Sequence, residues 1–255
     1  MGRIRQSICY GCFVRNGVTL EQVIEKAVAL GYQSIEMAPR NAWGKIKDAG
    51  LEIAIVGGHG TLTNGLNKRE NHDRIENELK ANIDTAVEWG IPSLIAFSGN
   101  RDGLPDDEGI EICAEGLARV VPYAEEKGVT ICMELLNSKV NHPDYQCDHT
   151  AWGVELCRRV NSPRFKLLYD IYHMQIMEGD LIRTITENIH YIGHFHTAGN
   201  PGRRDLDDAQ EIYYPAVMRA IAGTDYDGFV GHEFVPKEDP LAAMEAAFRT
   251  CDVEA

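Results

Sequence analysis

Four apolar runs in this chain each end in a side chain that can bind a metal ion. The runs cover residues 129–134, 165–170, 191–196 and 228–233, and they end in Glu134, Asp170, His196 and Glu233, respectively. A strand of a parallel sheet is a near-continuous apolar run because both of its faces are buried. In α/β proteins the carboxyl ends of such strands carry the functional groups. The pattern therefore predicts parallel strands that bring three carboxylates and one imidazole to one edge of a sheet.

The rest of the chain repeats the same alternation of strand and helix. Further strands are predicted over residues 5–13, 32–37, 51–56 and 92–97. Helices are predicted over residues 20–30, 43–49, 72–89, 110–127, 150–160, 180–189, 214–222 and 241–251. Eight strand–helix units in 255 residues are typical of one (β/α)8 TIM barrel, an α/β fold. A doubly wound sheet is the alternative, but the Gly-rich first turn that it needs is missing. We therefore predict a single TIM-barrel domain over residues 1–255.

Charge and cysteine content limit the partners and the compartment. The formal net charge of −14 argues against nucleic acid or an anionic membrane as the partner. Seven cysteines, an odd number spread over predicted strands and helices, indicate free thiols in a reducing compartment. Neither a signal peptide nor a run of membrane-spanning length is evident. We therefore predict a cytoplasmic protein with no membrane or nucleic-acid partner.

The strand-end carboxylates Glu134, Asp170 and Glu233 favour a bound cation. Any one of them could instead pair with Arg or Lys, but three at one edge would repel one another without a positive charge between them. His196 lies nearer the end of its strand than His194, so His196 is the predicted fourth ligand and His194 a core residue. An oxygen-rich site with one His suits Mg²⁺ or Mn²⁺, with Zn²⁺ or Co²⁺ as alternatives. We predict no nucleotide or organic cofactor.

Four other residues are candidates for contact with a substrate. His173 would lie over the mouth of the barrel, and Arg203 could bind a carboxylate by a forked hydrogen bond. Glu36 ends a predicted strand and could contact substrate or support a metal ligand. His59 belongs to a Gly-rich loop over residues 57–65. Each of these also has a structural alternative, such as a solvated loop arginine or an ion-paired carboxylate.

This set of residues suits proton transfer next to a carbonyl group. A divalent ion can bind the adjacent oxygens of an α-hydroxy carbonyl compound and make the C–H between them more acidic. Glu134 and Glu233 could then remove and return the proton through an enediolate. The expected reaction is an isomerisation of the aldose–ketose type or an epimerisation.

The same segments resemble the xylose-isomerase-like TIM barrels, most closely the hydroxypyruvate isomerases and, behind them, the ketose 3-epimerases. The resemblance covers essentially the whole chain and rests on residues 133–137 (MELLN), 169–175 (YDIYHMQ), 198–203 (AGNPGR), 211–215 (EIYYP) and 231–236 (GHEFVP). It implies metal binding by Glu134, Asp170, His196 and Glu233, acid–base chemistry by the two Glu residues, and substrate contacts from His173 and Arg203. His196 follows the epimerases, since hydroxypyruvate isomerases often carry Gln at this position.

The predicted function is therefore a metal-dependent isomerase of a small hydroxy-keto acid, with hydroxypyruvate and tartronate semialdehyde as the first pair. A 2-oxo-tetronate isomerase and a ketose 3-epimerase are the alternatives, and Arg203 favours an acid because a carboxylate gains from a forked partner. A dehydratase, a phosphoesterase and a ligand-binding barrel without turnover are more distant alternatives. The expected partner is the small-molecule substrate, and the sequence leaves a homo-oligomer open.

Overall fold

The computed structural model describes residues 4–254. Their mutual contacts divide the chain into two compact units, the first formed by residues 4–54, 180–190 and 194–254 and the second by residues 55–179 and 191–193. Among the described residues there are eight strands, in the order β2-β1-β8-β7 in the first unit and β6-β5-β4-β3 in the second. The strand pairings within each unit are parallel. The eight predicted strands are thus confirmed, whereas the single domain stays a prediction.

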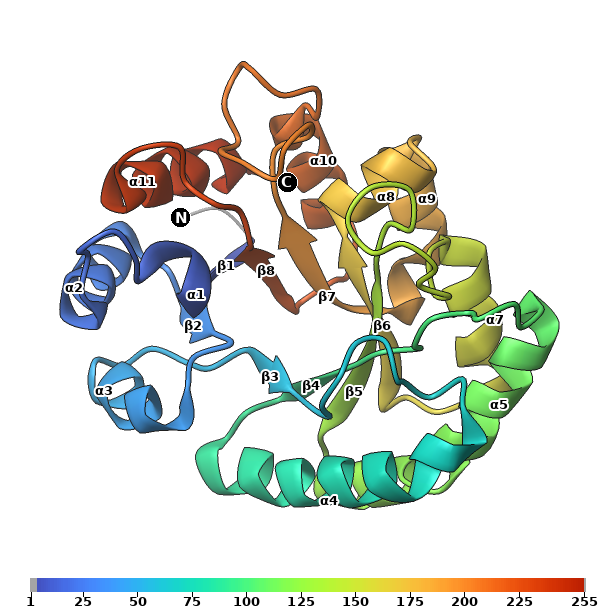
Figure 1. Cartoon of the computed structure of the whole chain (residues 1–255). Coiled ribbons are helices and arrows are strands. Elements are labelled where there is room, and N and C mark those ends of the chain that lie inside the picture. The colour runs from blue at the N-terminus through green and yellow to red at the C-terminus, as the bar shows by residue number, and fades with distance from the viewer. Residues whose placement is uncertain (1–3, 255) are drawn as a thin grey trace. The chain divides into compact units, whose positions relative to one another are not determined.

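In the first unit, β1 (Arg5–Cys9) lies between β2 (Ser34–Glu36) and β8 (Phe229–His232). On the other side of β8 is β7 (Ile192–Thr197), of which residues 194–197 belong to this unit. Helices α2 (Leu20–Leu30) and α11 (Pro240–Cys251) lie side by side next to β1, although they are far apart in sequence (Figure 1). The remaining elements are α1 (Tyr10–Phe13), η1 (Arg40–Ala42), α3 (Trp43–Asp48), α9 (Leu181–Asn188) and α10 (Tyr214–Ala222).

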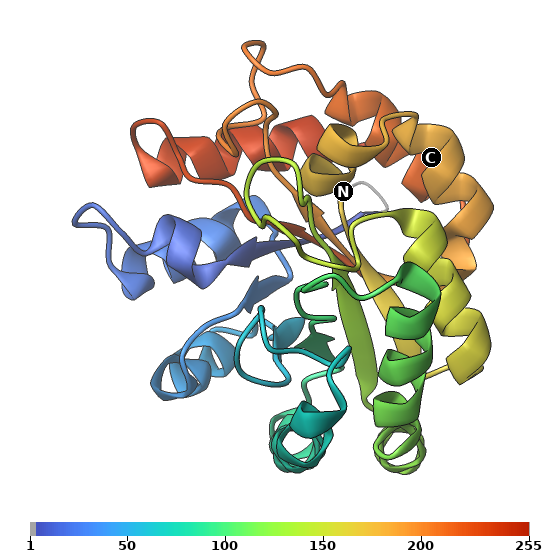
Figure 2. The same ribbon diagram turned by 45° about the vertical axis from the view of Figure 1, so that its right-hand side comes forward.

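The second unit contains the parallel strands β3 (Ile55–Gly57), β4 (Ser93–Ala96), β5 (Thr130–Leu135) and β6 (Phe165–Asp170). Their buried side chains pack into an apolar core that includes Ile55, Ile95, Cys132 and Leu168. Helices α5 (Asp106–Ala118) and α7 (Thr150–Val160) run side by side (Figure 2). The other elements are η2 (Arg69–Asn71), α4 (His72–Trp89), α6 (Val121–Lys127) and α8 (Ile171–Met177), and η3 (Ile189–Tyr191) lies at the boundary with the first unit.

Local capping explains why the helix boundaries were predictable. Thr19 accepts a hydrogen bond from the backbone of Gln22, whose side chain accepts one from the backbone of Thr19, which forms a complete capping box for α2. Gly31 ends this helix in the left-handed conformation with φ of 95°, which glycine adopts without steric cost. The predicted bounds of α2, α4, α7, α10 and β6 are confirmed residue for residue.

Several other predicted bounds were wrong. The predicted strand 5–13 ends at Cys9 and continues as α1, because a short apolar run does not distinguish a strand from a buried helical turn. The predicted helix 110–127 begins earlier, at Asp106, and breaks into α5 and α6 before Pro122, which fits only the first turn of a helix. The strand predicted over 51–56 begins four residues later, at Ile55, and ends one residue later, at Gly57.

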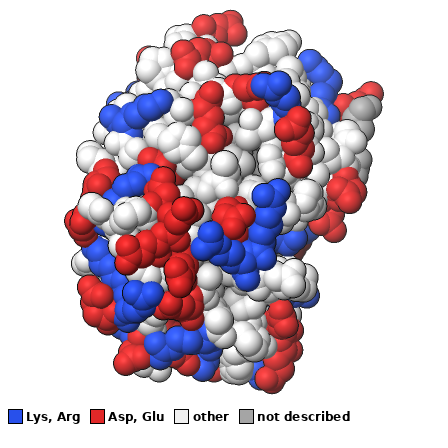
Figure 3. Space-filling model, turned by 90° about the vertical axis from the view of Figure 1, so that its right-hand side faces the viewer, with Lys and Arg blue, Asp and Glu red and all other residues white. Residues whose placement is uncertain are grey.

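The surface of the molecule carries charges of both signs. Figure 3 shows one face on which Lys and Arg side chains lie between Asp and Glu side chains. Such mixing keeps a net negative protein from forming one large anionic patch on that face. Within residues 4–254, no helix combines the length and the apolar character needed to cross a membrane.

Candidate metal centre

The predicted site residues are divided between the two units. The first unit contributes Glu36, His196, Arg203 and Glu233, and the second contributes His59, Glu134, Asp170 and His173. Each group is held by contacts within its own unit.

In the first unit, β7 carries His194 and His196 two residues apart, so both side chains leave the same face of the sheet. Their Nε2 atoms lie 3.2 and 2.8 Å, respectively, from the same oxygen, Oε1 of Glu36 at the end of β2. All three side chains are buried. Burial alone would raise the pKa of Glu36, but the charges and hydrogen bonds of the two histidines outweigh it and hold this pKa well below its ordinary value.

Glu233 follows β8 directly and meets two other predicted site residues. Its Oε2 lies 3.1 Å from Nδ1 of His196 and 2.5 Å from Nη2 of Arg203. Its backbone N–H donates to the carbonyl oxygen of Thr197 at 3.0 Å, which continues the pairing of β8 with β7 past the strand end. About a quarter of the Glu233 side chain is exposed (25%), and Arg203 is exposed to a similar extent. The predicted metal ligand His196 and the predicted anion-binding residue Arg203 therefore both contact Glu233, the predicted acid or base.

In the second unit, Asp170 ends β6 and also caps the next helix. Its Oδ1 accepts a hydrogen bond at 3.1 Å from the backbone N–H of His173, the third residue of α8. The Nε2 atom of His173 lies 3.7 Å from Oδ2 of Asp170, and its Nδ1 accepts from the backbone N–H of Asn137 at 3.1 Å. The three-residue spacing of Asp170 and His173 in the sequence is thus the spacing between a helix N-cap and the backbone N–H that it accepts from.

Glu134 lies on β5, which pairs with β6 in parallel. Its side chain is buried, and its backbone carbonyl accepts a hydrogen bond from the hydroxyl of Tyr145 at 2.9 Å. Because β5 and β6 are neighbours, Glu134 and Asp170 are both delivered near the carboxyl end of the same pair of strands. A buried carboxylate in such a position is costly without a compensating charge.

His59 is held by backbone groups on both sides of its ring. The N–H of Phe97 donates to Nε2 at 2.9 Å, and Nδ1 donates to the carbonyl oxygen of Gly60 at 3.0 Å. Burial lowers the pKa of His59, which keeps the ring in the neutral form that this pattern requires. These contacts assign His59 a structural role in fixing its loop against β4, and its contact with a substrate stays a prediction.

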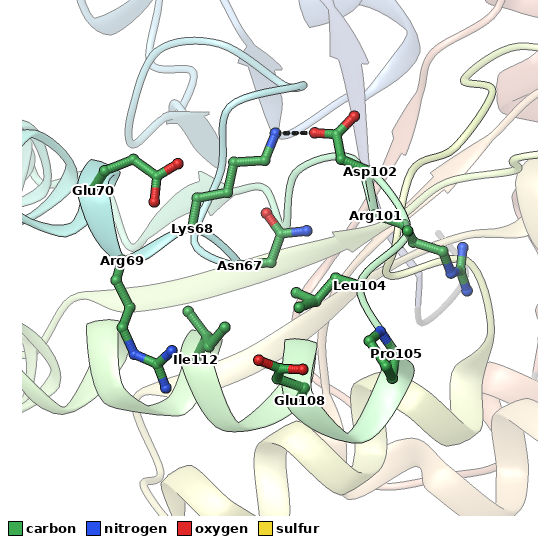
Figure 4. Close-up of a pocket in the computed structure, with 11 residues that line it drawn as sticks. Asn67, Lys68, Arg69, Glu70, Arg101, Asp102, Leu104, Pro105, Glu108 and Ile112 are labelled. Atoms are coloured by element: carbon green, nitrogen blue, oxygen red, sulfur yellow. Dashed lines mark hydrogen bonds and ion pairs between the residues drawn. The ribbon is translucent and has the colours of Figure 1, made fainter.

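The second unit also contains a pocket of about 580 Å³ between the loop before α4 and the start of α5 (Figure 4). Charged side chains surround it, and each basic one already has an acidic partner. Lys68 pairs with Asp102, Arg69 with Glu115 at 2.7 Å, and Arg101 with Asp148 at 3.1 Å. The eight predicted site residues are not among those that line it. We therefore assign no chemistry to this pocket.

Two residues that contact the predicted site residues were not predicted from the sequence. Asn137 was quoted within a motif without a role, yet it binds the ring of His173. Cys9 was predicted only as one of seven free thiols, yet its Sγ donates to Oε1 of Glu36 at 3.4 Å. Burial, and secondarily the charge of Glu36, raises the pKa of Cys9, so the thiol remains protonated and can donate. The position of Asn137 three residues after Glu134 was the one available signal.

Comparisons with known proteins agree on the fold. The model of the family "Xylose isomerase-like TIM barrel" matches residues 24–251. The chain is 32% identical over 130 residues to the 2-oxo-tetronate isomerase of Cupriavidus necator, covering 51% of this chain and 49% of that protein. It is 28% identical over 237 residues to the putative hydroxypyruvate isomerase of Homo sapiens, covering 87% and 86%, respectively. The match thus spans about half the length of the first relative and most of the second.

Solved structures extend the same comparison. The family 2 AP endonuclease from Brucella melitensis superposes with a TM-score of 0.82 at 22% identity, over 94% of this chain and 97% of that one. An L-ribulose 3-epimerase superposes with a TM-score of 0.77 at 19% identity, over 96% and 92%. At this level of identity, these structures show a common fold and leave the reaction to be argued from the residues.

Proposed function

Because the chain belongs to the xylose isomerase-like TIM-barrel family, we propose that it is a metal-dependent isomerase of a small hydroxy-keto acid. Family membership confirms the predicted (β/α)8 class. The names of the curated relatives, hydroxypyruvate isomerase and 2-oxo-tetronate isomerase, support the reaction class. The observation that carries the proposal is the contact of Glu233 with both His196 and Arg203.

The proposed cofactor is one divalent ion held by Glu134, Asp170, His196 and Glu233. Each of these side chains carries a carboxylate oxygen or an imidazole nitrogen that can bind a metal ion, and the family resemblance implies the same four residues. Three carboxylates and one imidazole form an oxygen-rich set that suits Mg²⁺ or Mn²⁺, with Zn²⁺ and Co²⁺ as alternatives. The 3.1 Å between His196 Nδ1 and Glu233 Oε2 also fits. Adjacent ligands of an octahedral ion at about 2.1 Å are roughly 3 Å apart.

In the proposed mechanism, two carboxylates on different strands share the proton transfer. When bound, the ion withdraws charge from the adjacent hydroxyl and carbonyl oxygens of the substrate and acidifies the C–H between them. One of Glu134 and Glu233 removes this proton, the other donates a proton of its own to the neighbouring carbon of the enediolate, and a proton passes from the hydroxyl oxygen to the carbonyl oxygen. The Arg203 guanidinium contacts the carboxylate of Glu233 and helps to hold it in place. Arg203 and the buried His173 are the proposed substrate contacts, with Arg203 orienting the substrate carboxylate.

Hydroxypyruvate is the first proposed substrate, and a four-carbon 2-oxo acid is the second. The second is favoured by the similarity to the Cupriavidus necator relative, which is named a 2-oxo-tetronate isomerase. A ketose is the third, because His196 is the residue that the ketose 3-epimerases carry. The two acids differ by one hydroxymethylene carbon, so the same carboxylate contact would serve both.

We expect metal-dependent uptake of deuterium from D₂O into the substrate, followed by NMR. The panel compares hydroxypyruvate, a four-carbon 2-oxo acid and fructose, each with Mn²⁺ or Mg²⁺ and with EDTA. The substrate with the fastest exchange and product formation identifies the branch of the family. Absence of exchange from all three, despite tight metal binding, would contradict the proposal, and loss of water from a substrate would indicate a dehydratase.

We also expect Mn²⁺ to stabilise the protein against unfolding. An ion that binds only the folded state, at 100 times its dissociation constant, adds about 2.7 kcal/mol to the free energy of unfolding. Urea titrations with Mn²⁺ and with EDTA measure this gain. The variant His196→Phe should lose it, whereas His190→Phe, at an exposed position, should keep it. Equal stability of the wild type with Mn²⁺ and with EDTA would contradict the proposed metal site.

The proposed location is the cytoplasm. All seven cysteines are free and six of them are buried, as expected for a protein in a reducing compartment. The proposed partner is the small-molecule substrate alone, and a homo-oligomer stays open.

A further inference from the structure

We propose that Glu36 is a positioning residue that fixes the ring of His196 so that Nδ1 is its metal-binding nitrogen. This inference rests on the proposed function, because it requires His196 to be a metal ligand. Of the two expectations for Glu36, contact with the substrate or support of a metal ligand, it favours the second. The side chain of Glu36 is 0% exposed, so it acts through its neighbours.

The contact between Glu36 and His196 determines which ring nitrogen carries hydrogen. Nε2 of His196 lies 2.8 Å from Oε1 of Glu36, within ordinary hydrogen-bond distance. An ionised carboxylate can only accept, so Nε2 is the donor. In a neutral ring, Nδ1 then has the lone pair. This atom faces the predicted ligand Glu233 at 3.1 Å.

A histidine that ligates a metal through one nitrogen commonly donates the other N–H to a carboxylate. This partner sets the ring orientation and increases the basicity of the ligating nitrogen. Glu36 and His196 match that arrangement, with the carboxylate on β2 and the ring on β7.

Two more donors hold Glu36 itself in place. Its Oε1 also accepts hydrogen bonds from Nε2 of His194 at 3.2 Å and from Sγ of Cys9 at 3.4 Å. Cys9 is the residue directly opposite Glu36 in the pairing of β1 with β2. One carboxylate oxygen is thus fixed by groups from two other strands. His194 was predicted as a core residue, and within the core it helps to hold the carboxylate of Glu36 in place.

The glycine opposite His196 provides the space that Glu36 occupies. Gly231 on β8 is the register partner of His196. A Cβ atom at position 231 would lie 2.3 Å from Oε1 of Glu36 and 2.7 Å from its Cδ. Because three donors fix this carboxylate, it cannot move aside without losing hydrogen bonds. Gly231→Ala should therefore displace Glu36 while it leaves every polar group of the network in the chain.

The cluster of Cys9, Glu36 and His196 also has the residue types of a separate site for a soft metal ion. Hydrogen bonding accounts for this cluster better, since the thiol and the imidazole N–H each point to the same acceptor oxygen. A metal at this place would have to displace the hydrogen on Nε2 of His196. The tautomer of this ring therefore distinguishes the two interpretations.

The first measurement is the tautomer of His196 in the wild type loaded with diamagnetic Mg²⁺, by long-range ¹⁵N–¹H NMR, because without an ion the Glu233 carboxylate also faces Nδ1. The proposal expects the Nε2–H form, and Glu36→Gln and Gly231→Ala should shift the ring toward a mixture of tautomers. The second measurement is Mn²⁺ affinity by calorimetry. Loss of a carboxylate behind a ligating histidine typically weakens metal binding about 10- to 100-fold, and we expect this range for both variants. Glu21→Gln and Gly44→Ala are the matched controls.

The controls lie in the same unit, away from the network. Glu21 is exposed and paired with Lys45, and a Cβ at Gly44 would meet open space, so both should leave affinity and tautomer unchanged. The Nδ1–H form in the wild type would overturn the inference and needs no variant. Wild-type affinity and an unchanged tautomer in Glu36→Gln would also overturn it while the proposed function stands. A wild type that fails to bind Mn²⁺ would instead overturn the proposed function and, with it, the role of Glu36.

Discussion

Replacing Glu134 or Glu233 with Gln is expected to lower the rate of isomerisation about 10²- to 10⁴-fold, the usual contribution of a general acid or base. The amide keeps the size of the side chain and one oxygen that can bind a metal, but it cannot accept and return a proton. The measurement is product formation by NMR in D₂O at saturating Mn²⁺. Calorimetry establishes the Mn²⁺ concentration that loads each variant, so that weaker metal binding is separated from lost proton transfer.

The two variants should differ in solvent exchange. The variant at the carboxylate that removes the proton loses both exchange and product. The variant at the other carboxylate keeps some exchange of the first proton but forms no product. Glu115→Gln, at an exposed position paired with Arg69, is the control and should behave as the wild type. If either variant, loaded with metal, keeps more than about a tenth of the wild-type rate, that residue is not the acid or base.

The strand ends were the most predictable part of this protein. Buried parallel strands are apolar throughout, so the polar residue at the end of each run is visible in the sequence. The structure puts Asp170 at the end of β6 and Glu233 directly after β8, as the pattern predicts. Helix boundaries were equally accessible wherever a cap or a glycine marked them, as at Thr19 and Gly31 of α2.

Contacts between distant strands were not predictable in the same way. Glu36 and His196 are 160 residues apart, and nothing local to either of them indicates the other. The role of Asp170 as the cap of α8 was hidden for a different reason. Most of this seven-residue helix is buried, so it lacks the polar face that reveals a helix in a sequence. The roles of Glu36, Cys9 and Asn137 therefore depend on the register of the sheet and on loop packing.

Acid is expected to destabilise the protein through His232. This ring is fully buried, with Nε2 2.9 Å from Oε1 of Gln6 and Nδ1 2.7 Å from Oγ1 of Thr197. Burial lowers its pKa from 6.5 to about 3, although the charge of Glu36 acts in the opposite direction. The unfolded chain therefore binds a proton at pH values where the folded chain does not. The stability that His232 contributes is complete above pH 6.5 and is lost as the pH falls toward 3.

Through His232, the free energy of unfolding is expected to fall by about 1.4 kcal/mol per pH unit, or by roughly 5 kcal/mol between pH 6.5 and pH 3. Urea titrations between pH 7 and pH 4 in EDTA measure it without a contribution from bound metal. In His232→Gln, the free energy of unfolding should depend on pH less steeply, by about 1.4 kcal/mol per pH unit. His190→Gln, at an exposed position, should leave this dependence unchanged. A constant destabilisation of His232→Gln at every pH would contradict the prediction. It would mean that His232 contributes only packing and its bonds to Gln6 and Thr197, and that other groups cause the loss of stability in acid.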